Sequence, residues 1–185
     1  MKQLWAVCAW VLCLPATAFA GEKGSVPPLT DLQVSASQTV RFRTPAGWTV
    51  KKGSGMPEVT EARGSGLILR IVWRKGEVGL DTLHVDCMLV RLAPENLSEP
   101  QVDYEYDFIS GPLGKRSALD SAFVVHFDEP IDGSRVWRQR NVSVVGEGES
   151  VCIIGYGPMP AAKKSTPLCK LLDAVMASVE FRPWH

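Results

Sequence analysis

The C-terminal part of the chain contains one strongly amphipathic stretch. Its apolar residues recur every three to four positions, which places their side chains on one face of an α-helix: Leu168, Leu171, Leu172, Val175, Met176 and Val179. Thr166 can accept a hydrogen bond from the first free backbone N–H groups, and Pro167 suits the first helical position because its missing N–H would have had no partner there. We therefore expect a helix from about Thr166 to Ser178 with one buried face.

Strands are expected on both sides of this helix. Two apolar runs, Val136 to Val145 and Val151 to Tyr156, flank Gly146-Glu147-Gly148-Glu149, a polar and glycine-containing loop typical of a β-hairpin. After the helix, residues 178–181 alternate between polar and apolar types as a strand does, until Pro183 ends the pattern. The C-terminal order is therefore strand, turn, strand, helix, strand.

Several upstream segments are also typical of strands. We expect strands at Val40–Arg43, Trp48–Lys51, Leu67–Trp73, Leu83–Leu92 and Leu119–Phe127. Because strands follow one another in meander order and only one helix is predicted, the fold class is α+β with a mainly antiparallel sheet. Neither an internal repeat nor a second domain is evident, so one domain is expected over residues 39–185.

The first residues have the pattern of a secretory signal peptide. A positive charge at Lys2 precedes the apolar run Leu4 to Leu14, which is too short to span a bilayer, and Ala18-Phe19-Ala20 is a small-x-small cleavage site. We expect cleavage after residue 20 and export to the periplasm; an uncleaved anchor helix is the alternative. Residues 21–38, rich in Gly, Pro and Ser at their start, are expected to form a mobile leader.

Charge and length limit the classes of partner. The chain has 20 basic and 20 acidic residues, and removal of the signal with Lys2 leaves 19 against 20. This balance favours neither nucleic acid nor an anionic membrane as partner. The remaining chain is long enough to bury roughly 70% of its unfolded surface without disulfides as staples.

Three cysteines lie beyond the signal: Cys87, Cys152 and Cys169. An exported protein can form a disulfide, and Cys152 with Cys169 is the expected pair because the end of a strand and the first turn of the next helix are often close. Cys87 would then be the free thiol. The alternative is that all three are buried thiols that pack as small hydrophobic side chains.

The chain resembles a known superfamily. The Pro45-Ala46-Gly47-Trp48 entry between two early strands, followed by a sheet, a closing hairpin, a helix and Ser178-Val179-Glu180-Phe181, is similar to the PsbP-like superfamily and its DcrB-like bacterial periplasmic branch. This resemblance implies an α/β/α sandwich, with helices on both faces of an antiparallel sheet, used mainly as a non-enzymatic binding or assembly module. The chain departs from the pattern in having no obvious long helix between Arg74 and Leu83. The sequence leaves open whether a second helical layer exists, and residues 95–108 are the segment that could supply it.

The segment 102–108 carries the most distinctive chemistry. If it is a strand, its carboxylates and its apolar side chains project from opposite faces: Asp103, Glu105 and Asp107 on one, Val102, Tyr104, Tyr106 and Phe108 on the other. The functional interpretation is an acidic surface that binds a basic partner protein, with Tyr104 and Tyr106 as anchors. The alternative is the solvated face of an edge strand, whose like charges prevent edge-to-edge pairing.

Candidate catalytic residues are few. His84, Asp86 and His126 match the two-histidine, one-carboxylate set that holds non-haem iron, provided that alternate strand residues present His84 and Asp86 on one face. The alternative is that they are ordinary core or surface residues. Neither Gly-x-Ser-x-Gly nor His-Glu-x-x-His occurs. No cofactor is expected.

Arginines surround two tryptophans of the predicted sheet. Arg135, Arg138 and Arg140 flank Trp137, and Arg70 and Arg74 flank Trp73. They could bind an anion or stack on the rings. We favour internal salt bridges and side chains extended over the sheet.

Together these patterns predict an exported periplasmic protein that is not an enzyme and that binds another exported or envelope protein. The two roles considered are a toxin-neutralising immunity protein and an accessory factor of an envelope machine. The predicted contact residues are Asp103, Tyr104, Glu105, Tyr106 and Asp107. The competing hypothesis is a ligand- or metal-binding protein that uses His84, Asp86 and His126.

Overall fold

The structure, a computed structural model, describes residues 26–89, 101–113, 115–131, 134–159 and 166–182. At 89, 101, 102, 104–109, 112, 113, 128, 129 and 131 it describes the backbone alone. The described elements are β1 (Asp31–Val34), β2 (Val40–Thr44), β3 (Thr49–Lys52), β4 (Glu58–Gly64), β5 (Leu67–Lys75), α1 (Leu80–Leu89), β6 (Gln101–Leu113), β7 (Arg116–Ile131), β8 (Ser134–Gly146), β9 (Glu149–Pro158), α2 (Pro167–Ala177) and β10 (Glu180–Phe181).

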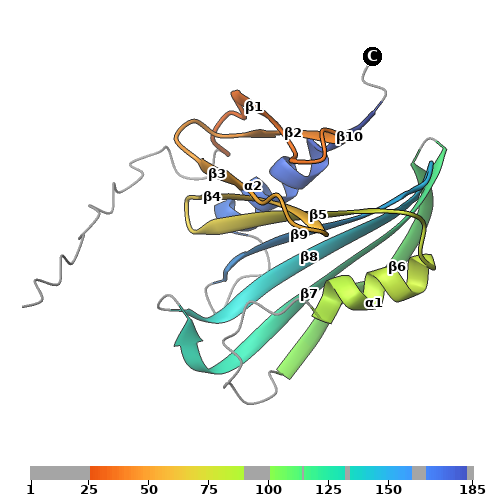
Figure 1. Cartoon of the computed structure of the whole chain (residues 1–185). Coiled ribbons are helices and arrows are strands. Elements are labelled where there is room, and N and C mark those ends of the chain that lie inside the picture. The colour runs from red at the N-terminus through yellow and green to blue at the C-terminus, as the bar shows by residue number, and fades with distance from the viewer. Residues whose placement is uncertain (1–25, 90–100, 114, 132–133, 160–165, 183–185) are drawn as a thin grey trace, which may run out of the picture.

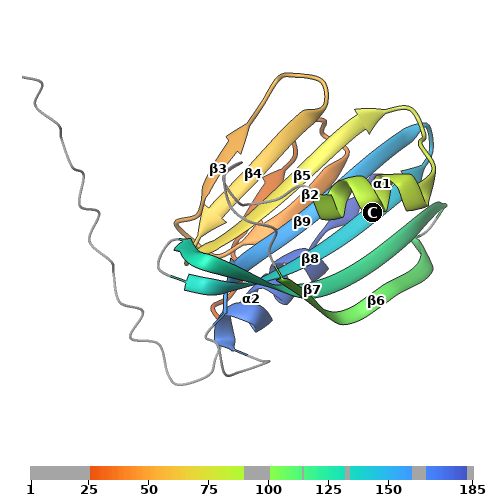
Figure 2. The ribbon, with the colours of Figure 1, turned by 90° about the horizontal axis from the view of Figure 1, so that it is seen from below.

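The strands form two antiparallel sheets. The larger sheet has seven strands in the order β3-β4-β5-β9-β8-β7-β6, and the smaller has three in the order β1-β2-β10. Helix α1 lies on one face of the large sheet, whereas α2 and the small sheet lie on the other (Figures 1 and 2). This arrangement confirms the predicted α+β class, with a mainly antiparallel sheet between helical layers.

Helix α2 and the last strand form as the sequence predicts. The Thr166 hydroxyl accepts a hydrogen bond from the Cys169 N–H at 3.2 Å, and Pro167 occupies the first turn. The apolar stripe is buried against the sheet. The Ser178 hydroxyl then donates to the Val175 carbonyl where the helix ends, and β10 follows, pairing with β2.

Alternate residues of the central strands supply two separate cores. Leu69 of β5 and Ile153 of β9 pack with α2 and the small sheet. Their chain neighbours Ile68 and Ile154 belong to a second core, together with Leu83 of α1. The large sheet is therefore apolar on both faces, as the central layer of a sandwich must be.

The β8–β9 hairpin closes through two residues, Glu147 and Gly148, with φ of 55° and 76°. Positive φ at both central positions is the backbone of a type I′ turn, which matches the right-handed twist of paired strands. The predicted hairpin is confirmed.

The expected strand at Leu83–Leu92 is wrong, because Leu80–Leu89 forms helix α1. Its buried side chains include Leu83 and His84, and Cys87 follows them by four and three residues, whereas Val85 and Asp86 in between are exposed. This spacing follows a helical period and not the two-residue period of a strand. Helix α1 supplies the second helical layer. The segment considered as its alternative source, residues 95–108, belongs to strand β6 from Gln101 onward.

The N-terminal region departs from the expected leader. Asp31–Val34 forms β1 and pairs with β2, and Val26 and Leu29 pack against the core, so residues 26–34 are not a mobile leader. The predicted signal peptide, residues 1–20, lies outside the described residues. Among the described helices, none is long and apolar enough to cross a membrane.

Candidate functional site

Strand β6 is the end strand of the large sheet. It runs for 13 residues and pairs with β7 from Gln101 through Leu113. No other described strand lies beside its outer edge (Figure 2). The predicted contact residues Asp103 to Asp107 therefore lie on a strand at the margin of the sheet.

Two irregularities interrupt the pairing of β6 with β7. Tyr104 pairs with Phe123, but Tyr106 pairs with Ala122, so two steps along β6 correspond to one step along β7. A second shift separates Tyr106 from Ile109. Because an extra residue in one strand reverses the alternation of faces, the register positions of Tyr104 and Tyr106 lie on opposite faces of the sheet.

The prediction that residues 102–108 carry three carboxylates on one face therefore rested on an assumption that does not hold. It assumed an unbroken strand with a period of two, and the bulges break that period between Tyr104 and Ile109. The acidic character of the edge remains. The side chains of Tyr104, Glu105, Tyr106 and Asp107 lie outside what the structure describes.

Asp103 is the predicted contact residue whose side chain is described. It is exposed, and its Oδ2 accepts a hydrogen bond from Nε2 of His126 on β7, at 2.9 Å. His126 is also partly exposed. The pair presents a carboxylate and an imidazole at the surface beside the sheet edge.

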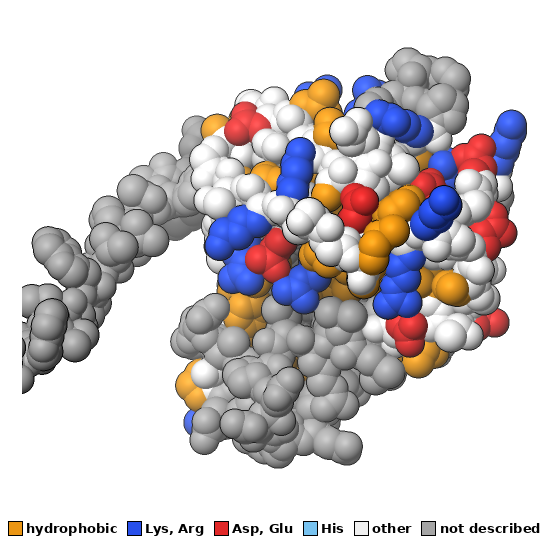
Figure 3. All heavy atoms as spheres, viewed as in Figure 1, with side chains coloured by type: hydrophobic (Ala, Val, Ile, Leu, Met, Phe, Trp, Pro, Cys, Tyr) orange, Lys and Arg blue, Asp and Glu red, His pale blue; other side chains and the backbone are white. Residues whose placement is uncertain are grey.

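Among the described residues, neither sign of charge dominates the face seen in Figure 3. Lys and Arg side chains are interspersed with Asp and Glu there, as the equal numbers of basic and acidic residues suggest. The run of acids in β6 is therefore a local feature.

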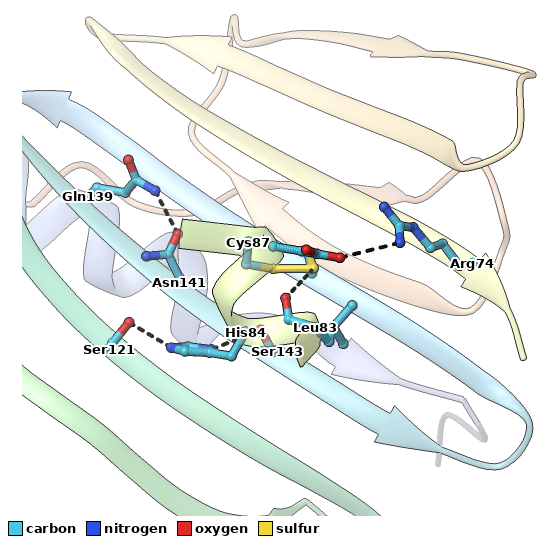
Figure 4. Close-up of a disulfide and its surroundings, with 10 residues drawn as sticks. Arg74, Leu83, His84, Cys87, Ser121, Gln139, Asn141 and Ser143 are labelled. Carbon is cyan, nitrogen blue, oxygen red and sulfur yellow. Dashed lines mark hydrogen bonds and ion pairs between the residues drawn. A yellow bond between two sulfur atoms is a disulfide. The ribbon is translucent and has the colours of Figure 1, made fainter. Parts of the chain in front are cut away.

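His84, Asp86 and His126 do not come together. His84 is fully buried under α1, with Nδ1 2.9 Å from the Ser143 hydroxyl and Nε2 2.8 Å from the Ser121 hydroxyl (Figure 4). His126 and Ser121 are five residues apart in the regular part of β7, so His126 belongs to the opposite face of the sheet.

Asp86 is exposed on α1 and lies 3.8 Å from Arg74, as a weak ion pair. The predicted iron-binding set is therefore wrong, because its three members have three different environments. Within the described part of the chain, no group of three His, Cys, Asp or Glu residues is placed to hold a metal ion.

The disulfide joins Cys87 of α1 to Cys152 of β9, with Cα atoms 5.9 Å apart (Figure 4). Cys169 is a buried free thiol. The predicted Cys152–Cys169 bridge is wrong because Cys152 belongs to the α1 face of β9, whereas Cys169 is on α2, across the sheet. Cys152, Ile154 and Tyr156 are alternate residues of one strand and therefore lie on one face of it. This pattern could have indicated the Cys87–Cys152 pairing only if α1 had been recognised as a helix.

The arginines of β8 form internal ion pairs. Arg138 contacts Asp173 of α2 at 2.9 Å, and Arg140 contacts both Asp173, at 3.1 Å, and Asp120 of β7, at 2.6 Å. These bridges confirm the salt-bridge interpretation for Arg138 and Arg140.

Sequence reasoning missed a polar group buried on the α1 face. Gln139 donates to the Asn141 side chain at 2.8 Å (Figure 4), and the hydroxyl of the fully buried Tyr156 has no hydrogen-bond partner among the described residues. Burial raises the pKa of Tyr156, and the nearby Arg70 opposes this. No local motif marks these residues, because their burial follows from strand pairing over long distances in the chain.

Glu61 on β4 also has a shifted pKa. Burial raises its pKa, but hydrogen bonds from Arg63 and Arg70 outweigh burial, so that the pKa lies below its ordinary value. This cluster is an ion-pair network on the sheet. It does not include a nucleophile.

Comparison with known proteins gives a fold and no named function. No family model and no curated protein matches the chain. The solution structure of cyanobacterial PsbP (CyanoP) from Synechocystis sp. PCC 6803 is similar, with a TM-score of 0.58 and 14% identity over 88% of this chain and 98% of that one. A crystal structure from Bacteroides thetaiotaomicron matches with a TM-score of 0.50 and 11% identity, over 84% of this chain and 49% of that one. The fold is PsbP-like, as the sequence resemblance implied, and at these identities the likeness shows the fold alone.

Proposed function

We propose that this protein, whose fold is PsbP-like, is an exported, non-catalytic module that binds another protein of the periplasm or envelope through strand β6. Its role is that of an accessory or neutralising protein, either an immunity protein that blocks a toxin or hydrolase, or a factor of an envelope machine. No cofactor takes part.

One observation carries the proposal. Strand β6 is acidic, stands at the margin of the large sheet and has no described strand beyond it. A rigid sheet that presents an exposed Asp103 at its margin is suited to binding a basic partner, because complementary charge speeds the encounter and fixes the orientation of the complex.

Two features support export. The first 20 residues have the pattern of a cleaved signal peptide. The buried Cys87–Cys152 disulfide is typical of proteins that fold in an oxidising compartment. The periplasm is the compartment that fits both.

The test is affinity capture from an envelope extract of the source organism. The bait is residues 21–185 with a C-terminal tag, as the wild type and as two variants with equal change in net charge. One variant carries Asp103→Lys, Glu105→Lys and Asp107→Lys. The control carries Asp31→Lys, Asp81→Lys and Asp86→Lys, which lie on β1 and α1.

We expect one stoichiometric partner with the wild type and the control, and its loss with the β6 variant. Capture of the same partner by all three baits would contradict the role of β6. Recovery of the wild-type bait alone, at low and moderate salt, would contradict the existence of a dedicated partner. Mass spectrometry of the mature protein from the organism tests cleavage after residue 20.

A further inference from the structure

Among the described strands of the large sheet, β6 has the longest edge without a described neighbour. β6 has 13 residues, whereas β3 at the opposite end has four. The inner edge of β6 pairs with β7, so alternate backbone N–H and C=O groups along the outer edge have no described strand to bond with (Figure 1). An edge of this length is a template for one more strand.

The charge pattern of β6 selects against some strands and favours others. Residues 101–113 include Asp103, Glu105 and Asp107 and no Lys or Arg. A second copy of β6, paired antiparallel across a two-fold axis, would bring like charges opposite each other, which is destabilising in a sheet. A segment that carries lysine or arginine would bring opposite charges beside these acids instead.

We propose that β6 binds its partner by strand addition, and that the partner's contribution is an extended segment that carries basic residues. This inference rests on the proposed function and names the kind of partner segment that β6 takes. The backbone bonds supply affinity, and the carboxylates supply the preference for a basic sequence.

The bulges define where the added strand pairs. Register with β7 is regular over Gln101–Tyr104 and again from Ile109 to Leu113. Between them the strand is irregular, and irregular backbone does not offer evenly spaced donors and acceptors. Protection by the partner is therefore expected in these two stretches and not at residues 105–108.

Strand β3 is an internal control on the same sheet. It also forms an end of the large sheet, but it is short and carries the exposed Lys51 and Lys52. A basic strand that binds to unpaired edges without regard to charge would pair with β3 as well. One that is selected by the acids of β6 would leave β3 unchanged.

The experiment uses synthetic peptides and amide hydrogen exchange. One nine-residue peptide alternates lysine with valine; a second has the same lysines, with proline in place of valine, and so cannot donate backbone hydrogen bonds at those positions. Exchange of backbone amides is measured by NMR on labelled residues 21–185, with each peptide and without peptide. Sedimentation of the protein alone, over a range of concentrations, reports self-association.

We expect the lysine–valine peptide to slow exchange by at least about tenfold in the regular stretches of β6 and to leave β3 unchanged. The proline peptide should give no protection. Equal binding of both peptides would overturn strand addition in favour of charge attraction alone. Protection at β3 as well as β6 would overturn the selection of a basic segment by the acids of β6. Self-association through β6 would overturn the choice of a basic partner segment.

The outcomes separate this inference from the proposed function. If an envelope partner is captured and is lost with the β6 charge variant, but the partner does not protect β6 amides, the function stands and strand addition fails. If the basic peptide protects β6 while the charge variant still captures the same envelope partner, strand addition stands and the proposed function of β6 fails.

Discussion

Cys87 and Cys152 join helix α1 to β9, the central strand of the large sheet, across 65 residues of sequence. The bridge lies in the second core, where Cys87 is fully buried and the Cys152 sulfur lies 3.7 Å from the Leu83 carbonyl oxygen. Since α1 follows directly after β5, the disulfide fixes where the helix lies on the sheet.

Loss of this bridge is expected to lower the free energy of unfolding by about 4 kcal/mol, because a loop of this length loses much conformational entropy when it is closed in the unfolded chain. Denaturant unfolding measures the free energy of unfolding of the wild type and of the double variant Cys87→Ala, Cys152→Ala. Cys169→Ala is the control, because Cys169 is not in the disulfide. It should leave unchanged the difference in the free energy of unfolding between the oxidised and the reduced protein. A wild type that is equally stable with and without reductant would contradict the expectation.

Gly155 permits the close approach of α2 to β9. A Cβ atom at this position would lie 2.6 Å from the Met176 sulfur and 2.8 Å from a Leu172 methyl group. We expect Gly155→Ala to destabilise the protein by about 1 to 3 kcal/mol through overpacking. Met176→Ala in the same chain should recover part of the loss.

Gly55→Ala is the matched control, because nothing lies within 4 Å of a Cβ there. It should change the free energy of unfolding by less than about 0.5 kcal/mol. Additive losses for Gly155→Ala and Met176→Ala would show that the two positions do not compete for the same space.

Much of the fold follows from local patterns. The helix at Pro167–Ala177 and the β8–β9 hairpin were predictable because periodicity, capping and turn residues all agree in those segments. Helix α1 was not, since its ten residues mix apolar and charged types without a continuous stripe. Its position depends on tertiary contacts, namely His84 between two serines and Cys87 in the bridge.

The candidate site was predictable in composition and not in geometry. The acids of residues 103–107 are visible in the sequence, and the structure places them on an end strand. The bulges were not predictable, because a bulge depends on how β6 matches β7 and carries no local signature here. The pairing of Cys87 with Cys152 was missed for a related reason, since it follows from the face to which each residue belongs.

Arg116 is the centre of a buried ion-pair network at the β8–β9 turn. Its guanidinium contacts Glu147 at 2.6 Å and Glu149 at 2.9 Å, donates to the Arg182 carbonyl at 3.1 Å, and lies 5.1 Å from the ring centre of Phe181. Arg116→Ala leaves the buried Glu149 carboxylate without this cation. We expect a loss of about 3 to 5 kcal/mol in the free energy of unfolding.

Arg74→Ala is the surface control for this prediction. Arg74 and Asp86 are both about half exposed and 3.8 Å apart. Arg74→Ala should therefore lower the free energy of unfolding by no more than about 0.5 kcal/mol. Denaturant unfolding of the two variants measures the difference. Equal effects would mean that the Arg116 network contributes no more than a surface pair.

Tyr156 is expected to make the free energy of unfolding depend on pH in the alkaline range. Burial raises the pKa of its phenol above the ordinary value of 10.0. Above pH 10 the unfolded chain therefore releases a proton that the folded chain still holds, and the free energy of unfolding falls as pH rises through the folded pKa. Below the unfolded pKa the contribution of Tyr156 to stability is fully present.

Tyr156→Phe should abolish this component of the alkaline loss. It should also leave the protein as stable or up to about 1 kcal/mol more stable near neutral pH, because no described residue forms a hydrogen bond with the buried hydroxyl. The measurements are phenolate absorbance against pH and denaturant unfolding at neutral and alkaline pH, for both proteins. A marked loss of stability at neutral pH in the Phe variant would show that the hydroxyl is hydrogen-bonded in solution. Identical alkaline profiles would show that Tyr156 does not carry the pH dependence.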